Sequence, residues 1–271
     1  MSQLNAVELA KEVEADIIQW RRDLHQIPEL GLVLPQTVAY VKNILDGFGI
    51  EYDASYVNGN GIVALIHGKK SELNSDKVLA FRADMDGLPI NEATGLAFSS
   101  LNQNMHACGH DGHTAMLLGA AKILQENRDQ FAGTIKLIFQ PGEEYPGGAE
   151  PMIQEGAMLN PKVTRVMGFH QGQIDPKVPK GTIAYKEGPI MASMDRFLIE
   201  VNGKGYHGAY PEESQDPIAA AGQLINALQT IKSRNVKAVN PAVVSITRVQ
   251  GGFNQNIIPD KVELEGTVRA L

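Results

Sequence analysis

Cysteine is scarce in this sequence, which has one, Cys108, among 271 residues. A single cysteine cannot form an internal disulfide, so we expect a protein of the reducing cytoplasm. Long hydrophobic runs are missing too, and no stretch approaches the length of a transmembrane helix, which argues against a membrane protein. The first twenty residues lack the basic end and apolar centre of a signal peptide, and we expect a surface helix there.

Excess positive charge is also lacking. The chain has 24 Lys and Arg against 31 Asp and Glu, a formal net charge of −7, and it contains no basic cluster. This balance argues against nucleic acid as a partner. Hydrophobic residues make up 43% of the chain, which is enough to build the core of one large domain or of two modest ones.

Short β-rich runs alternate with helical patterns up to about residue 183. The runs are GIVALIHG (61–68), VLAFRAD (78–84), TIKLIFQ (134–140) and VTRVMGF (163–169). Near-continuous apolar strands are typical of a sheet that is covered on both faces. Helical patterns cover residues 113–127 and 148–159. The alternation predicts an α/β layered domain over residues 1–183.

The pattern changes beyond this point. Strand-like and helical stretches follow in the order β-α-β-β, at residues 197–201, 216–234, 242–249 and 261–270. Asp216 and Pro217 suit the first two positions of the helix. In the last stretch Val262 and Leu264 alternate with charged residues, so one face of that strand is in water. We expect a second, α+β domain over 184–271, which lacks the further helix and strand of a complete split βαβ unit.

Side chains of the types that bind metals follow the predicted strands or precede the helix at 113–127. They are Asp84, Asp86, Cys108, His110, Glu143, Glu144 and His170. In open α/β sheets ligands bind beyond the carboxyl ends of the strands, so four loops should meet at one edge. Each piece alone has a plainer interpretation, as a structural histidine, a solvated loop or a small buried cysteine. Together they predict a metal centre.

Six stretches of the chain closely resemble the metal-dependent N-acyl-amino-acid amidohydrolases, the group of aminoacylases, hippurate hydrolases and auxin-conjugate hydrolases. They are RADMDGLP, MHACGHDGHTAMLLGAA, FQPGEE, GFH, DPIAAAGQLINALQTI and NIIPDKVELEGTVR. The resemblance implies a zinc-peptidase-like α/β catalytic domain with an inserted, ferredoxin-like α+β lid. It also implies a C-terminally incomplete chain, because the family continues with the rest of both domains and a final His ligand.

The resemblance implies roles for individual residues of the catalytic domain. The residues that match the family's metal ligands are Cys108, His110, Glu144 and His170. Glu143 matches the general base, which passes a proton from water to the leaving nitrogen. Asp86 matches an acidic residue that supports the metal cluster. The cofactor is expected to be a divalent metal, two ions per site, of zinc, manganese, cobalt or nickel.

The resemblance also implies roles in the lid. His207, in GKGYHGAY, matches a histidine that helps to hold the substrate or the developing oxyanion, and Asn256, in NIIPD, matches a substrate-binding residue near it. The expected partners are a small N-acyl amino acid or peptide and a second copy of the chain, joined through the lid. The sequence departs from the family at Tyr206 and Glu212, and in HQGQIDP, where relatives often carry a tryptophan. These positions leave the substrate side chain open.

Several alternatives stay open at this point. The chain could be a metallo-carboxypeptidase or dipeptidase of the same fold, or a non-catalytic remnant. It could also be a cysteine hydrolase with Cys108 as nucleophile. The roles of Asp84, His106 and His113 are not fixed by the sequence, and His25 and His67 are expected to be structural or surface residues.

Overall fold

The structure, a computed structural model, describes residues 5–71, 76–172 and 178–271. Two compact units divide the chain, Met1–Lys177 and Val178–Leu271. The boundary between them lies a few residues before the position at residue 183 that the sequence suggests. No helix in these ranges combines the length and the apolar character that a membrane span requires.

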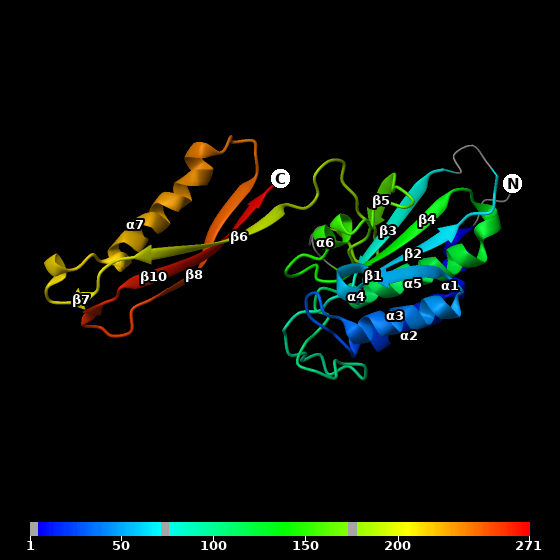
Figure 1. Ribbon diagram of the computed structural model, residues 1–271, viewed down its shortest axis with the longest axis horizontal. Helices are drawn as coiled ribbons and strands as arrows, with labels where there is room; N and C mark the ends of the chain where they lie inside the picture. Colours follow the sequence, from blue (N-terminus) through cyan, green and yellow to red (C-terminus); the bar gives the residue numbers. More distant parts are fainter. Residues whose placement is uncertain (1–4, 72–75, 173–177) are drawn as a thin grey trace. The chain divides into compact units, whose positions relative to one another are not determined.

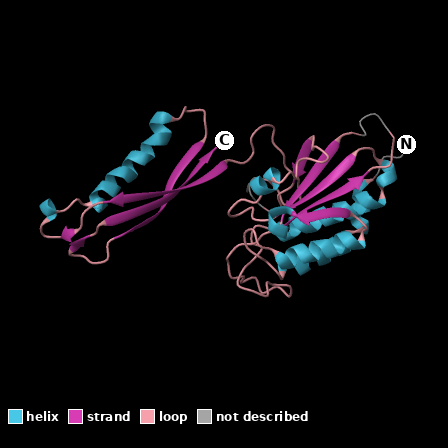
Figure 2. Cartoon of the chain, in the orientation of Figure 1, coloured by secondary structure: helices cyan, strands magenta, loops and turns pink. Residues whose placement is uncertain are grey.

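The first unit contains a five-stranded mixed sheet (Figures 1 and 2). In spatial order its strands are β1 (Glu51–Ser55), β2 (Gly61–His67), β4 (Thr134–Gln140), β3 (Val78–Asp84) and β5 (Arg165–Gly168). β3 runs parallel to β4 and β5, whereas β2 runs antiparallel to β1 and β4. The four predicted strands are confirmed. β1 is an addition that the sequence analysis missed, and β5 lies at the edge of the sheet, exposed along its length.

Helices precede and connect these strands. They are α1 (Ala6–Glu12), α2 (Glu14–His25), α3 (Pro35–Gly47), the short α4 (Tyr56–Gly59), α5 (His110–Glu126) and α6 (Ala149–Gln154), with a 3₁₀ turn at Arg128–Gln130. The predicted N-terminal helix is broken into α1 and α2 at Val13, which is buried. Two helix boundaries were wrong in the prediction. α5 starts earlier, at His110, and α6 ends earlier, before a left-handed Gly156.

Two hydrophobic clusters hold the helices to the sheet. The larger one joins α3 and α5 to one face, with Val41, Leu118 and Phe139 fully buried in it. The smaller one joins the region of α6 to the opposite face, where Ile138 points. Full burial of one such side chain stabilises the fold by roughly 1.5–3 kcal/mol. Adjacent residues of β4 thus face different layers, and this is the two-sided cover that its apolar run predicts.

Lys136 of β4 is a buried exception within this apolar run. Its Nζ donates hydrogen bonds to the backbone carbonyls of Ala157, Leu159 and Pro161, at 3.0, 2.6 and 3.0 Å. A buried ammonium is costly without partners, and three carbonyl oxygens supply them. Lys136 therefore ties β4 to the segment that leads from α6 into β5.

The second unit is an antiparallel sheet with one long helix. Its strands in spatial order are β6 (Ser193–Asn202), β10 (Lys261–Ala270) and β8 (Ala242–Gly251), and its helix is α7 (Pro217–Thr230), followed by a π-helical turn at Ile231–Asn235. The predicted β-α-β-β order is confirmed, and Asp216 caps α7 by accepting from the backbone N–H groups of Ile218 and Ala219. Two small elements were not predicted: a ladder of β7 (Tyr206–His207) with β9 (Ile257–Ile258), and a short 3₁₀ helix at Pro211–Glu213.

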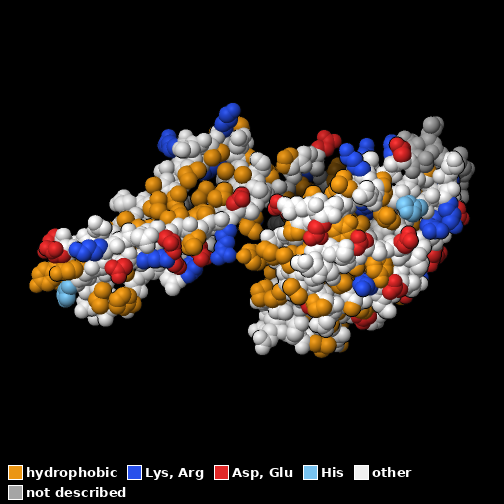
Figure 3. All heavy atoms as spheres, in the orientation of Figure 1, with side chains coloured by type: hydrophobic (Ala, Val, Ile, Leu, Met, Phe, Trp, Pro, Cys, Tyr) orange, Lys and Arg blue, Asp and Glu red, His pale blue; other side chains and the backbone are white. Residues whose placement is uncertain are grey.

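The two faces of this sheet differ as the alternation in β10 predicts. Val262 and Leu264 are buried in a small core with Ala221 of α7. On the other face Glu265 pairs with Arg196 and Arg248 across the strands. Figure 3 shows hydrophobic side chains gathered on the surface of this unit. Over the unit as a whole, the hydrophobic side chains that are at least half exposed include Ile218, Val239, Val243, Val249 and Phe253.

Candidate metal centre

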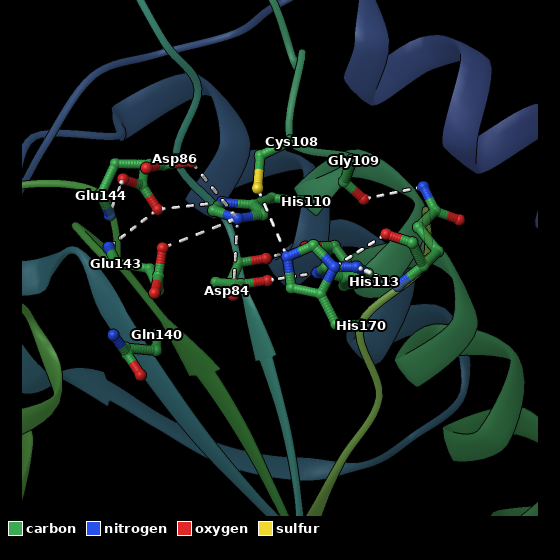
Figure 4. Close-up of polar contacts among 12 residues, drawn as sticks. Asp84, Asp86, Cys108, Gly109, His110, His113, Gln140, Glu143, Glu144 and His170 are labelled. Atoms are coloured by element: carbon green, nitrogen blue, oxygen red, sulfur yellow. Dashed lines mark hydrogen bonds and ion pairs between the residues drawn. The ribbon is translucent and has the colours of Figure 1, made fainter. Parts of the chain in front are cut away.

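Three neighbouring strands and one helix bring the metal-binding side-chain types to one edge of the first sheet (Figure 4). β3, β4 and β5 are parallel, so their carboxyl ends lie together. Among the residues that the structure describes, three overlapping groups have potential ligand atoms within 4.8 Å of one another. They are Cys108 with His110 and His170, Asp84 with His110 and His113, and His110 with Glu143 and Glu144. The four loops therefore do converge.

Two glycines make the turns that aim these side chains. Gly109 adopts φ 94° and is the N-cap of α5, which lets Cys108 before it and His110 after it face the same cluster. Gly142 adopts φ 61° in the turn that carries Glu143, and a Cβ there would lie 2.6 Å from Leu32. Left-handed backbone of this kind favours glycine. The glycines of the Cys-Gly-His and Pro-Gly-Glu-Glu motifs are thus needed for the backbone conformation of the two turns.

His110 lies at the centre of the cluster and is fully buried. Its Nδ1 lies 3.3 Å from Asp86 Oδ1, and because a carboxylate only accepts, Nδ1 carries a proton. Its Nε2 is buried without a hydrogen-bond partner in the part of the chain that the structure describes. Oxygens of Asp84, Glu143 and Glu144 lie 3.6, 3.9 and 4.0 Å from this nitrogen.

These surroundings fit a divalent cation. Burial lowers the pKa of His110, but the hydrogen bond to Asp86 and the nearby carboxylates outweigh burial and raise that pKa above its ordinary value. The negative field that stabilises a proton on the ring stabilises a metal ion as well. Imidazole nitrogen, thiol sulfur and carboxylate oxygen together form a donor set suited to zinc and similar divalent metals.

Cys108 and His170 face each other across the cluster, with Sγ 3.3 Å from Nε2. Nδ1 of His170 lies 2.8 Å from the backbone carbonyl oxygen of Gln171, so Nδ1 carries the proton and Nε2 presents a lone pair. Burial, with the neighbouring Glu144, raises the pKa of Cys108 to about 12. The thiolate is the form of cysteine that both binds metal and acts as a nucleophile, and in these surroundings a bound cation would favour it.

Asp86 organises the turn that carries the two glutamates. Its carboxylate is buried and accepts the backbone N–H groups of Glu143 and Glu144 at 2.9 and 3.1 Å, in addition to its contact with His110. Burial, followed by the charge of Glu144, raises the pKa of Glu143 above its ordinary value. A carboxylate with a raised pKa is better suited to accept and return a proton near neutral pH.

His113 does not offer a free nitrogen, although it lies in one of the three groups. Its Nδ1 donates to Asp84 Oδ1 at 2.6 Å, and its Nε2 accepts the backbone N–H of Gln171 at 2.8 Å. Asp84 also accepts from Arg82 at 2.7 Å. Burial raises the pKa of Asp84, but the His113 hydrogen bond and the Arg82 charge outweigh it and hold that pKa well below its usual range. His113 therefore supports the cluster from outside, whereas Oδ2 of Asp84 also lies 3.6 Å from Nε2 of His110.

His106, which the sequence left open, is buried, and neither ring nitrogen has a hydrogen-bond partner within the described ranges. Burial lowers its pKa to about 4, so the ring is neutral near neutral pH. The centroid of its ring lies 6.3 Å from that of the His25 ring.

A buried ionic network beneath the start of α5 escaped the sequence analysis. His25 of α2 lies 2.7 Å from Asp111 through Nδ1 and 3.3 Å from Glu92 through Nε2, and Arg21 lies 2.8 Å from Asp111. Two acceptors on one ring are satisfied only by the doubly protonated imidazole. The hydrogen bond to Asp111 accordingly raises the pKa of His25, against the opposing effect of burial. The network fixes α2 against the first turn of α5.

Replacing His25 by Gln should destabilise the first unit in a pH-dependent way. Because the folded state raises the pKa of His25 above the unfolded value of about 6.5, its contribution is complete below that pH and is lost as pH rises through the folded pKa. We expect the free energy of unfolding of the variant to be lower than that of the parent by on the order of 3 kcal/mol at low pH, and this difference should shrink as pH rises.

The measurement is guanidinium unfolding followed by fluorescence of Trp20, the single tryptophan, which packs against the core of this unit. His67→Gln is the matched control, because His67 is exposed and contacts the Thr134 hydroxyl. If the loss of unfolding free energy in His25→Gln stays constant or grows as pH rises, the folded state does not raise the pKa of His25.

The two predicted substrate residues of the lid lie in the second unit. His207 pairs with Ile257 in the ladder of β7 and β9, and the carbonyl of Asn256 accepts the N–H of Gly208 at 2.7 Å. His207 Nδ1 accepts the N–H of Ala209 at 3.1 Å. The fold thus brings His207 and Asn256 together, both exposed, and their contact with substrate stays a prediction. Of the divergent stretch HQGQIDP, residues 173–176 lie outside the described residues.

Comparison with known proteins agrees with this arrangement. The profile of peptidase family M20/M25/M40 matches residues 80–262. The chain is 45% identical to an N-acetylcysteine deacetylase of Bacillus subtilis, over 96% of this chain and 66% of the relative. It is 44% identical to thermostable carboxypeptidase 1 of Saccharolobus solfataricus, over 96% of this chain and 65% of the relative.

A solved structure from Bacillus subtilis, described as a dinuclear metal-binding peptidase from the M20 family, superposes with a TM-score of 0.75. It is 42% identical in sequence, and the match covers 96% of this chain and 65% of that one. The chain spans slightly less than two thirds of the length of the two curated relatives named above.

Proposed function

Because this chain belongs to peptidase family M20/M25/M40, we propose that it contributes the metal centre of an amidohydrolase that acts on N-acyl amino acids. Water is added across the amide bond, and the products are a carboxylic acid and a free amino acid. The observation that carries this proposal is the buried Nε2 of His110, which lacks a hydrogen-bond partner among the described residues and faces three carboxylates.

The proposed metal ligands are Cys108, His110, Glu144 and His170. Nε2 of His110 and Nε2 of His170 both present lone pairs, because the opposite nitrogen of each ring is committed to an oxygen acceptor. A bound divalent metal supplies Lewis-acid stabilisation for negative charge on the scissile carbonyl oxygen and makes water more acidic. The relative described as a dinuclear metal-binding peptidase supports two ions per site. We propose zinc, manganese, cobalt or nickel.

Glu143 is the proposed general base. Its carboxylate borders the cluster, is partly exposed, and has a raised pKa. In this role it takes a proton from the attacking water and delivers it to the amide nitrogen as the C–N bond breaks. Asp86 holds the Glu143 backbone in place and keeps the proton of His110 on Nδ1. The two adjacent glutamates thus have different proposed roles: Glu143 transfers the proton, and Glu144 binds the metal.

The substrate class is supported by the deacetylase relative and by an N-acyl-L-amino acid amidohydrolase of Geobacillus stearothermophilus that is 43% identical. Carboxypeptidase activity is the second candidate, favoured by the similarly close thermostable carboxypeptidase. His207 and Asn256 are proposed to contact the substrate. The exposed hydrophobic side chains of the second unit support a homodimer formed through that unit. The single cysteine supports a cytoplasmic location.

Metal removal tests the proposal directly. The chain is dialysed against EDTA and assayed on N-acetyl amino acids and on N-blocked dipeptides, before and after addition of zinc or manganese. We expect hydrolysis of the N-acetyl compounds to be largely lost on chelation and restored by metal. Iodoacetamide sensitivity without EDTA sensitivity would instead favour a thiol enzyme. A chain with neither bound metal nor activity would support the non-catalytic alternative.

A further inference from the structure

Gln171 touches both segments that carry the proposed ligands. Its backbone N–H donates to Nε2 of His113 at 2.8 Å, and its carbonyl oxygen accepts from Nδ1 of His170 at 2.8 Å. Its side-chain Nε2 donates to the carbonyl of Gly109 at 2.9 Å. Gly109 lies between Cys108 and His110, so one residue joins the loop after β5 to the turn before α5.

Gly112 provides the space for this side chain. A Cβ at Gly112 would lie 2.2, 2.4 and 2.5 Å from Nε2, Oε1 and Cδ of Gln171. Gly112 is an internal residue of α5 and does not have the left-handed φ that would by itself require glycine. Glycine weakens a helix interior relative to alanine, so Gly112 needs a reason to be there. The close packing of the Gln171 side-chain amide against it supplies that reason.

We propose that Gln171 is a positioning residue for His170, and that its amide, seated on Gly112 and bonded to Gly109, holds the His170 ring with Nε2 toward Cys108. The proposal rests on the proposed role of His170 as a metal ligand. The backbone carbonyl of Gln171 fixes the tautomer of His170, and this carbonyl stays in place because the side chain and His113 anchor the residue from two directions. In this role Gln171 acts through His170 and is not itself a proposed ligand.

Without the side-chain anchor, the contact of its backbone N–H with His113 is the one that still holds the Gln171 backbone, as far as the described residues show. The carbonyl can then turn away from Nδ1 of His170, and the proton of that ring distributes between its two nitrogens. A ring with its proton on Nε2 cannot ligate through that atom. Partners that orient a metal-bound histidine typically change metal affinity by about 10–100-fold.

The test compares four variants of the full chain. Gln171→Ala removes the amide, Gly112→Ala displaces it, and the double variant does both. Gly119→Ala is the matched control, because it lies in the same helix and its Cβ would meet Ile17 at 2.4 Å, away from His170. Zn²⁺ affinity is measured by competition with a chromophoric chelator. The tautomer of His170 is measured by ¹⁵N NMR of the metal-free protein, with the signal assigned from its loss in His170→Asn.

Each single variant at position 112 or 171 should bind Zn²⁺ about tenfold more weakly than the parent, and the double variant no more weakly than Gln171→Ala. The Nδ1–H tautomer of His170 should dominate in the parent and in Gly119→Ala, and should be mixed in the other three. The proposal would be overturned if Gln171→Ala kept the Zn²⁺ affinity and the His170 tautomer of the parent. It would also be overturned if the double variant bound Zn²⁺ about a hundredfold more weakly than the parent, because the two substitutions would then act independently. If the parent binds no Zn²⁺, the proposed function fails, and the tautomer measurement still decides the role of Gln171.

Discussion

Replacing Glu143 by Gln should lower the rate of N-acyl amino acid hydrolysis by about 10²–10⁴-fold while metal content stays at the level of the parent. Glutamine keeps the size of the side chain and cannot take a proton from water. The backbone N–H of Glu143 still donates to Asp86, so the turn should hold its shape. The measurement pairs steady-state kinetics on an N-acetyl amino acid with metal analysis of the same sample.

Glu144→Gln is the matched control for this experiment. The two glutamates are adjacent, share Asp86 as an acceptor of their N–H groups, and differ in their proposed roles. Glu144→Gln should lose metal together with activity, whereas Glu143→Gln should lose activity alone. Activity within a few-fold of the parent in Glu143→Gln would eliminate it as the general base, and metal loss in that variant would make it a ligand instead.

Replacing Cys108 by Ala should weaken metal binding by more than the roughly 10–100-fold that loss of an orienting partner causes, because a donor atom itself is removed. Sγ of Cys108 lies in one group of candidate ligand atoms with His110 and His170. Equilibrium dialysis with Zn²⁺ gives the affinity. The Co²⁺-substituted protein reports the sulfur directly, since its thiolate-to-metal charge-transfer band should disappear in the variant.

Cys108→Asp separates ligation from nucleophilic catalysis. A carboxylate can replace the thiolate as a metal ligand, so this variant should retain more metal and more activity than Cys108→Ala. If Cys108 is instead a nucleophile, a carboxylate cannot replace its thiol. Both variants should then be equally inactive, and both should bind metal as the parent does. Metal affinity equal to that of the parent in Cys108→Ala would remove this residue from the ligand set.

The strands and the metal-binding loops were predictable because their signals are local. β2, β3 and β4 are near-continuous apolar runs bounded by polar turns, which is what a sheet covered on both faces requires. Metal donors at the ends of β3, β4 and β5 follow from chain order alone. β1 was missed because its five residues alternate around an exposed edge and carry no apolar run. The early start of α5 was missed because it depends on the backbone of Gly109.

Other features depend on contacts between residues far apart in the chain. His25 looks ordinary in the sequence, and only packing of α2 on α5 puts its ring between Asp111 and Glu92. His113 carries the same side chain as the proposed ligand His110 and lies one turn further along α5, but Asp84 and Gln171 occupy both of its nitrogens.

The sequence by itself predicted a metal centre, because four loops that carry metal-donor side chains should meet at the carboxyl ends of the strands. The tertiary structure decided which donor atoms are free. That choice depends on hydrogen-bond partners that arrive from other strands and helices, such as Asp86 at His110 and the Gln171 carbonyl at His170. A histidine becomes a candidate ligand only where the fold occupies one of its ring nitrogens and leaves the other facing the cluster.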